Sequence, residues 1–194
     1  MSEKAEIRAA KPTDAQKLLD IYAYYVKNTA ITYEYEVPSL QEFENRISNT
    51  LKKYPYLVAY ADGEILGYAY ASRFKERAAY GWDAEMTVYL NPEKRGYGIG
   101  GKLYALMEEI LKAQGVVKAI AIITPPMDDS QAKVYNSVHF HEKMGYRMEG
   151  MVENCGYKFG RWYNTVLMDK TLNLPTDNMQ PIKSFDRVKD IFGL

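Results

Sequence analysis

The chain has 194 residues, of which 47% are hydrophobic and 26% charged, and this composition is typical of one ordinary globular domain. Lys and Arg together number 25, as do Asp and Glu, so clustered positive charge for a nucleic-acid partner or a membrane surface is not expected. The single cysteine and the lack of an apolar run near the ~20 residues of a membrane helix predict a cytoplasmic protein without disulfides.

The first part of the chain predicts one strand followed by two helices. Residues 5–9 form the strand, and Thr13 with Gln16 is a capping-box pattern at the start of a helix. Ser39 with Glu42 is a second such pattern, and apolar residues recur at helical spacing behind both.

Three strands are predicted next. Asp62-Gly63 separates two apolar runs, 56–61 and 64–72, which is a strong hairpin signal. Residues 80–90 alternate as a half-buried strand does, so that Glu85 falls on its polar face. The remaining predictions are a helix after a glycine-rich segment, a strand over 116–123, a helix with Val134, Val138 and His141 that ends at Gly145, and strands over 146–155 and 162–169.

This order predicts an α/β fold with a single mixed, mostly antiparallel sheet and helices on both faces. The predicted domain covers residues 1–170, and residues 171–194 form a tail with a short helix.

Residues 95–102, Arg-Gly-Tyr-Gly-Ile-Gly-Gly-Lys, open the helix that follows the third of these strands. Glycines let successive backbone N–H groups converge on one phosphate, and the N-terminal end of the helix adds positive potential. Arg95 and Lys102 are candidate counter-charges. The pattern therefore predicts a phosphate or pyrophosphate site, although another phosphate ligand or a plain turn remains open.

A dinucleotide-binding reading of the same glycines fits poorly. It requires an acidic residue about 20 positions further on, and residues 118–123 contain none. It also requires a repeating βαβ series, whereas three antiparallel strands come first. The Gly-x4-Gly-Lys-Ser/Thr spacing of a P-loop is absent as well.

Three side chains are candidates for chemistry. Glu85 lies among apolar neighbours, which raise a carboxylate pKa toward the range of a general base, although a solvated residue on a polar face is the alternative. His141 is expected to face inward, where a lone histidine is more often a core residue. Cys155 has no base beside it in sequence and is interpreted as a plain buried or edge-strand thiol.

Several segments over residues 5–170 resemble the GNAT acetyltransferases, and among these the phosphinothricin and methionine-sulfoximine acetyltransferases. They are the glycine-rich segment, Trp-x-Ala-Glu-x-Thr-Val-Tyr around Glu85, the stretch from His141 to Tyr146, and residues 156–162. The resemblance implies the GNAT fold, acetyl-CoA as co-substrate without a metal, and direct acetyl transfer to the amine of a small amino acid or analogue. It also implies a homodimer.

The resemblance assigns roles to individual residues. Glu85 is the general base, and His141 protonates or hydrogen-bonds the departing thiolate. The acceptor is bound by Tyr33, Lys75, Arg77 and Tyr80, which implies an anionic group on the acceptor. The cofactor is bound by Val88, Tyr89, Leu90, Arg95, Gly96, Tyr97, Gly98, Ile99, Gly100, Gly101 and Lys102.

Two departures from the family pattern bear on the site. An asparagine is expected soon after residue 123, but the chain reads Thr-Pro-Pro-Met-Asp-Asp over 124–129 and carries extra residues up to Asn136, with Asp128 or Asp129 as substitutes. Asn164 stands where an aspartate is usual. A CoA-binding regulatory module without turnover, or a protein N-acetyltransferase, therefore remains an alternative.

Overall fold

The structure is a computed structural model that describes residues 5–94, 98–128 and 136–194. Its helices and strands are β1 Glu6–Ala9, α1 Ala15–Asn28, α2 Leu40–Leu51, β2 Tyr56–Ala61, β3 Glu64–Arg73, β4 Asp83–Leu90, α3 Ile99–Gln114, β5 Lys118–Ile123, α5 Ser137–Lys143, β6 Arg147–Lys158 and β7 Arg161–Thr171.

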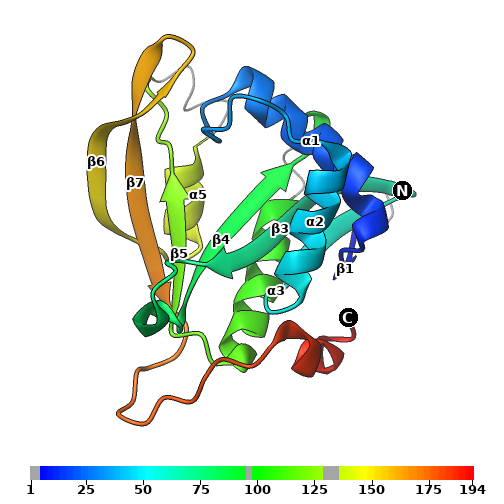
Figure 1. The fold of residues 1–194 in the computed structure, drawn as a ribbon, viewed down its shortest axis with the longest axis vertical. Coiled ribbons are helices and arrows are strands. Elements are labelled where there is room, and N and C mark those ends of the chain that lie inside the picture. Colours follow the sequence, from blue (N-terminus) through cyan, green and yellow to red (C-terminus); the bar gives the residue numbers. More distant parts are fainter. Residues whose placement is uncertain (1–4, 95–97, 129–135) are drawn as a thin grey trace.

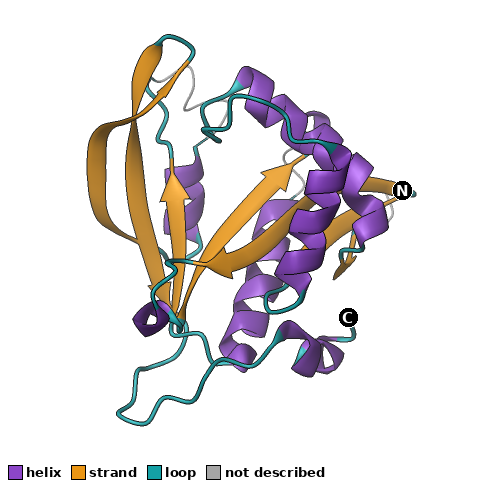
Figure 2. Cartoon of the chain, in the orientation of Figure 1, coloured by secondary structure: helices purple, strands orange, loops and turns teal. Residues whose placement is uncertain are grey.

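The seven strands form one sheet in the order β1-β2-β3-β4-β5-β7-β6 (Figure 1). Among the described strands β4 and β5 pair in parallel, and the other neighbours are antiparallel. Helices cover both faces (Figure 2), so the predicted fold class is confirmed. Over the described ranges, no helix combines the length and apolarity needed to cross a membrane.

The two faces of the sheet carry side chains of different size. Helices α1 and α2 pack on a face where Tyr56, Tyr68 and Tyr89 project into the core. On the opposite face the strands present alanines such as Ala69 and Ala84, and these short side chains let α3 lie close to the sheet. The alternation of side chains along each strand separates the two sets.

The hairpin and one helix cap follow the sequence prediction. Asp62 and Gly63 both have positive φ, 52° and 78°, as a tight two-residue hairpin turn requires. Ser39 is the N-cap of α2, and its side chain accepts a hydrogen bond from the backbone N–H of Glu42.

The predicted capping box at Thr13 is wrong. Residues Pro12–Asp14 form a 3-10 turn, and the N-cap of α1 is Asp14. The Asp14 carboxylate instead accepts from the backbone N–H of Lys11 at 2.8 Å and forms an ion pair with Arg8 at 2.7 Å. The Asp14 carboxylate therefore stabilises the turn before α1, and no side chain caps the helix itself.

Other predicted boundaries shift by a few residues. The predicted strand 80–90 begins at Asp83, because Ala78–Tyr80 form a 3-10 turn. Asn136 is the N-cap of α5, so the helix that His141 occupies begins at Ser137; Val134 lies outside the described residues. Gly145, with φ of 88°, follows the end of α5 as expected.

The tail packs against the domain core. Its predicted short helix is a pair of 3-10 turns, Phe185–Arg187 and Lys189–Phe192. Phe185 and Val188 are buried beside α3. The Gln114 side chain, at the end of α3, donates to the carbonyls of Lys53 and Lys183, both at 2.7 Å, and so ties the tail to the loop after α2.

The parallel pairing of β4 with β5 stops after three residue pairs. The last pair is Glu85 with Ile120. Beyond it β4 stays paired with β3 up to Leu90, whereas β5 stays paired with β7 up to Ile123. The two strands therefore diverge toward their C-terminal ends, and Figure 1 shows the V-shaped opening between them.

Candidate active site

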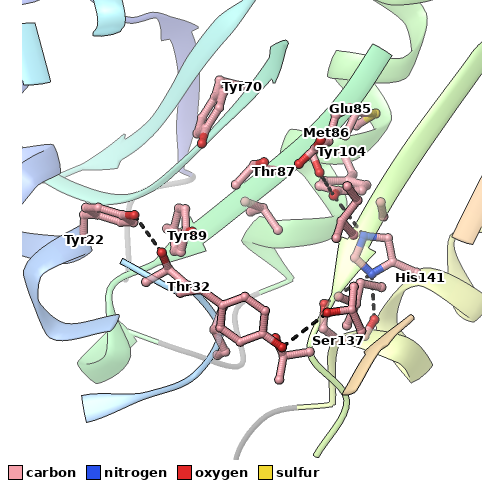
Figure 3. A pocket seen from close by; sticks show the side chains of 18 residues that line it. Tyr22, Thr32, Tyr70, Glu85, Met86, Thr87, Tyr89, Tyr104, Ser137 and His141 are labelled. Carbon is pink, nitrogen blue, oxygen red and sulfur yellow. Dashed lines mark hydrogen bonds between the residues drawn. The ribbon is translucent and has the colours of Figure 1, made fainter. Parts of the chain in front are cut away.

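A cavity of about 260 Å³, here called the split cavity, occupies the opening between β4 and β5. Its walls come from these two strands, from α1 and the segment after it, and from α3 and α5 (Figure 3). Five of the residues predicted for the site line it, namely Tyr33, Glu85, Val88, Tyr89 and His141. The topology thus brings together residues that lie far apart in the sequence.

Glu85 lies at the point where β4 and β5 part. Its neighbour on the same face, Tyr89, packs against α1, so the carboxylate enters the cavity from the α1 and α2 side of the sheet. Burial raises the pKa of the Glu85 carboxyl, and the nearby positive charge of Lys75 lowers it by a smaller amount. A half-buried carboxylate with a raised pKa suits proton transfer near neutral pH.

His141 enters the cavity from the opposite face and is 3% exposed. Its Nδ1 lies 2.6 Å from the Ser137 carbonyl oxygen, which can only accept, so Nδ1 carries the proton. Its Nε2, 2.9 Å from the Tyr104 hydroxyl, is then an acceptor. Burial lowers the pKa of His141 to about 4, against the opposing effect of the Ser137 hydrogen bond, so the ring is neutral at pH 7.

Tyr104 lines the split cavity but was missed by the sequence analysis, because it lies among the apolar residues of α3 and nothing in the sequence sets it apart. Its hydroxyl is 3.2 Å from the Met86 carbonyl as well as 2.9 Å from His141 Nε2. One hydroxyl proton cannot serve both acceptors at once. Burial is the main cause of a strongly raised pKa for Tyr104, so this phenol stays protonated.

Tyr33, predicted to bind the acceptor, lines the split cavity. Its hydroxyl donates to the Asn164 carbonyl at 3.1 Å, across from β7. A side chain at Gly156 of β6 would overlap the Tyr33 ring, so glycine is required for this close approach. The segment after α1 is therefore held against the β6–β7 hairpin.

Lys158 holds the same segment and was also missed. It is 2% exposed, and its ammonium donates to the carbonyls of Thr29 and Thr32 at 2.9 and 2.8 Å. Burial lowers its pKa, although the charge of Glu34 opposes this. From the sequence alone, a lysine near a strand end is expected to be exposed to solvent. The carbonyls that accept its hydrogen bonds lie in a segment without regular secondary structure.

Three of the predicted acceptor residues lie outside the cavity wall. Lys75, Arg77 and Tyr80 are exposed in the segment before β4, and none of them lines the split cavity. Lys75 is still near enough to Glu85 to affect its pKa. The assignment of these three residues to acceptor binding stays a prediction.

The start of α3 fits a phosphate-binding role. Gly98 is its N-cap with φ of 69°, and no side chain caps the helix there. The first N–H groups of α3 thus have no side-chain partner of this kind, as an anion site requires. Lys102 is exposed in the first turn. Arg95, Gly96 and Tyr97 of the predicted loop lie outside the described residues.

The free edge of β4 faces the opening. Its carbonyls at Met86 and Leu90 accept hydrogen bonds from the hydroxyls of Tyr104 and Tyr25. By the alternation of the ladder, Val88 turns its backbone N–H and C=O to the same side, midway between them. This edge can therefore pair with an extended, amide-bearing ligand.

The departures from the family pattern have structural counterparts. The Asn164 side chain accepts from the backbone N–H of Asn154 at 3.0 Å and so holds an irregular part of β6. Thr124 lines the split cavity, whereas Asp129 lies outside the described residues. Cys155 is an exposed thiol on the edge strand, consistent with the edge-strand interpretation.

The chain is similar to known acetyltransferases over most of its length. Residues 7–167 match the family model described as an acetyltransferase (GNAT) domain. The chain is 32% identical to a phosphinothricin N-acetyltransferase of Streptomyces viridochromogenes, over 88% of this chain and 89% of that one. It is 30% identical to an L-methionine sulfoximine/L-methionine sulfone acetyltransferase of Pseudomonas aeruginosa, over 87% of this chain and 95% of the relative.

A solved structure resembles the whole fold. It is a GNAT superfamily phosphinothricin acetyltransferase from Sinorhizobium meliloti in complex with acetyl-CoA. The TM-score is 0.81 at 34% sequence identity, and the match covers 93% of this chain and 98% of the other.

Proposed function

The chain belongs to the GNAT acetyltransferase family, and from this we propose that it transfers the acetyl group of acetyl-CoA to the amine of a small amino acid or amino-acid analogue. One observation carries the proposal: the half-buried Glu85 carboxylate, with its raised pKa, stands where β4 and β5 diverge. Both relatives named above are N-acetyltransferases of such small amines.

The cofactor is held by the opening and the helix next to it. The first turn of α3, from Gly98 to Lys102, binds the pyrophosphate through backbone N–H groups. The edge of β4 at Val88 would pair with the amide-bearing arm. Acetyl-CoA would supply the acetyl thioester, and Glu85 and His141 line the cavity that would receive it.

Glu85 carries the proton transfer. The acceptor enters as an ammonium ion, and its proton passes to the Glu85 carboxylate before the amine nitrogen forms its bond to the acetyl carbon. After the bond forms, the thiolate leaves and the nitrogen gives its second proton to water, which balances the proton that the thiolate takes from water. The Glu85 carboxyl then returns the first proton to solvent. The pKa of Glu85, raised by burial, brings its basicity closer to that of the group it must deprotonate.

In this proposal His141 positions another side chain and does not transfer a proton itself. A neutral ring with its proton on Nδ1 has no proton to give from Nε2, so the departing thiolate takes its proton from water. We assign to His141 the orientation of the Tyr104 hydroxyl on the cavity wall. This replaces direct protonation by His141 with a positioning role.

Lys75, Arg77 and Tyr80 complete the acceptor site in this proposal. Lys75 acts electrostatically on Glu85, so a carboxylate beside the reacting amine lies within reach of the same positive charge. Tyr33, held by Asn164 and packed on Gly156, forms the opposite wall.

The test is Glu85→Gln, which keeps the shape of the side chain and removes its basicity. General bases commonly contribute about 10²–10⁴-fold, so kcat should fall by that factor while acetyl-CoA affinity stays within a few-fold. Thiol release measured against pH should show a rising limb in the wild type that the variant lacks. An unchanged limb would remove Glu85 from the base role, and acetyl-CoA binding without thiol release for any amine would favour a regulatory module.

Two features of the whole protein also belong to the proposal. The chain forms a homodimer through the edge strand β6, whose apolar residues Met148, Met151 and Val152 are each more than half exposed. The protein works in a reducing compartment such as the cytoplasm, where the exposed Cys155 stays a thiol.

A further inference from the structure

A second cavity adjoins the split cavity on the α1 and α2 side of the sheet, and it has no role in the site described so far. It has a volume of about 320 Å³ and lies between α2 and strands β2, β3 and β4; we call it the tyrosine pocket. Its aromatic lining residues are Tyr22, Phe43, Tyr56, Tyr68, Tyr70 and Tyr89.

The tyrosine pocket and the split cavity share part of their lining. Tyr22, Tyr70 and Tyr89 line both. Tyr70 pairs across the sheet with Thr87, and Glu85 is the next residue of β4 on the same face, so Tyr70 is a diagonal neighbour of the carboxylate. On its other side Tyr70 pairs with Tyr56 and stacks on it at 5.0 Å. The pocket therefore begins one strand away from Glu85.

The lining favours a planar, apolar ligand group. Tyr56, Tyr68 and Tyr70 stack on one another with interplanar angles of 16° to 21°, so they form one continuous aromatic wall of the pocket. Aromatic rings add stacking and edge contacts to simple burial. Pockets lined mostly by aromatic groups with few polar ones are typical of small-molecule sites.

The charges of the lining disfavour an anionic group in this pocket. Arg46 is the one basic residue among its lining residues, all of which the structure describes. Its guanidinium already pairs with Glu34 at 2.8 Å and with Glu42. No positive charge is left there for a phosphinate or a second carboxylate.

We propose that the tyrosine pocket receives the side chain of the acceptor, and that the acceptor is an α-amino acid with an aromatic side chain. The proposal rests on the function above: the amine lies at Glu85, the carboxylate faces Lys75, and the ring passes Tyr70 into the pocket. The preferred acceptor then differs from phosphinothricin, whose side chain is short and anionic.

The first arm of the test is a panel with the wild-type protein. Thiol release from acetyl-CoA is measured with L-tryptophan, L-tyrosine, L-alanine and phosphinothricin. We expect kcat/KM for the better aromatic amino acid to exceed those for L-alanine and phosphinothricin at least tenfold. Turnover of L-alanine or phosphinothricin with no aromatic preference would overturn this inference and leave the proposed function intact. No thiol release with any amine would overturn both.

The second arm uses two asparagines one turn apart on α2. Asn49 lines the tyrosine pocket and Asn45 does not, while both are exposed. Asn49→Trp should fill the pocket and lower kcat/KM for the aromatic substrate at least tenfold, with L-alanine changed less than threefold. Asn45→Trp is the matched control and should leave both values unchanged. Equal effects of the two variants on the aromatic substrate would overturn the inference.

Discussion

The positive charge of Lys75 acts on the Glu85 carboxylate of the split cavity. The lysine is exposed, yet its charge lowers the Glu85 pKa against the larger effect of burial. Lys75→Met removes the positive charge that lowers the Glu85 pKa and leaves the burial that raises it. The pKa of Glu85 should therefore rise further.

The consequence is a shift in the pH profile. The base is active when ionised, so the rising limb of kcat against pH should move to higher pH in Lys75→Met, and the variant should be several-fold slower than wild type below the limb. Lys17→Met, an exposed lysine on α1, is the control and should leave the limb in place. An unmoved limb in Lys75→Met would mean that the two charges are screened from each other.

His141 should make the stability of the protein depend on pH. Its pKa in the fold is about 4, below the ordinary value of 6.5, so between these values the unfolded chain binds the proton and the folded chain does not. Stability is therefore lost as the pH falls through this window. From pH 7 to pH 5 the free energy of unfolding should drop by about 2 kcal/mol on this account.

Urea unfolding of the wild type and of His141→Gln at pH 7 and pH 5 checks this prediction. The variant is less stable at pH 7, because it disturbs the contacts to Ser137 and Tyr104, but it should lose about 2 kcal/mol less than wild type between the two pH values. Parallel losses in both proteins would show that other groups dominate the titration.

At the scale of elements, the β6–β7 hairpin holds the segment after α1. We call this segment, which carries Tyr33, the acceptor wall, because we propose that it binds the acceptor. Lys158 donates to Thr29 and Thr32 from the end of β6, and Gly156 leaves room for the ring of Tyr33. Lys158→Met removes both charge-assisted hydrogen bonds, each commonly worth about 1.5–3 kcal/mol. The wall should loosen, so KM for the amine should rise about tenfold while KM for acetyl-CoA stays unchanged.

Steady-state kinetics with each substrate varied in turn measures both constants. Lys170→Met is the matched control, since Lys170 is a second lysine of the sheet, with partners in Glu108 and Met144 away from the acceptor wall. It should reduce the melting temperature without raising the amine KM. An equal rise of both Michaelis constants in Lys158→Met would indicate a general loss of structure.

Elements with strong local signals could be predicted from the sequence, and those fixed by distant contacts could not. Asp62-Gly63 and Ser39 mark a turn and a cap through their own backbone chemistry, and both are confirmed. Thr13 also fits a local pattern, but the Asp14 carboxylate with its Arg8 ion pair prevails there. The boundaries of the hairpin strands followed the hydrophobic pattern closely.

The residues of the candidate site also divide into those that could be predicted from the sequence and those that could not. Glu85 and His141 could be singled out because the segments around them resemble the family and because Glu85 has apolar neighbours in sequence, and both line the split cavity. Tyr104 fits the apolar pattern of α3 and gave no reason to be singled out. The burial of Lys158 depends on two carbonyls more than a hundred residues earlier in the chain, and no local pattern encodes that contact.

At the scale of the whole molecule, the exposed edge of the sheet predicts the state of assembly. Val152 of β6 is 60% exposed beside Met148 and Met151, and an apolar edge strand readily pairs with another copy. Val152→Lys should place a charge in that interface. Light scattering should give twice the chain mass of 22.3 kDa for the wild type and one chain mass for the variant.

Ile191→Lys is the control for this prediction. Ile191 is 72% exposed and lies in the tail, away from β6. The control should keep the mass of the wild type, because it adds the same charge at an apolar surface position outside the proposed interface. A wild type that already has the mass of one chain would refute the dimer.

The contacts of the tail imply an order of events while the chain is being made. Ribosomes add residues at about 5–20 per second from the N-terminal end, so α3 and the strands it covers are complete well before Phe185 and Val188 appear. Until then the face of α3 that these residues bury stays open to solvent, and the Gln114 amide lacks its Lys183 partner. A nascent chain stalled before residue 185 should therefore be recognised by chaperones and proteases, although its catalytic strands have already been synthesised.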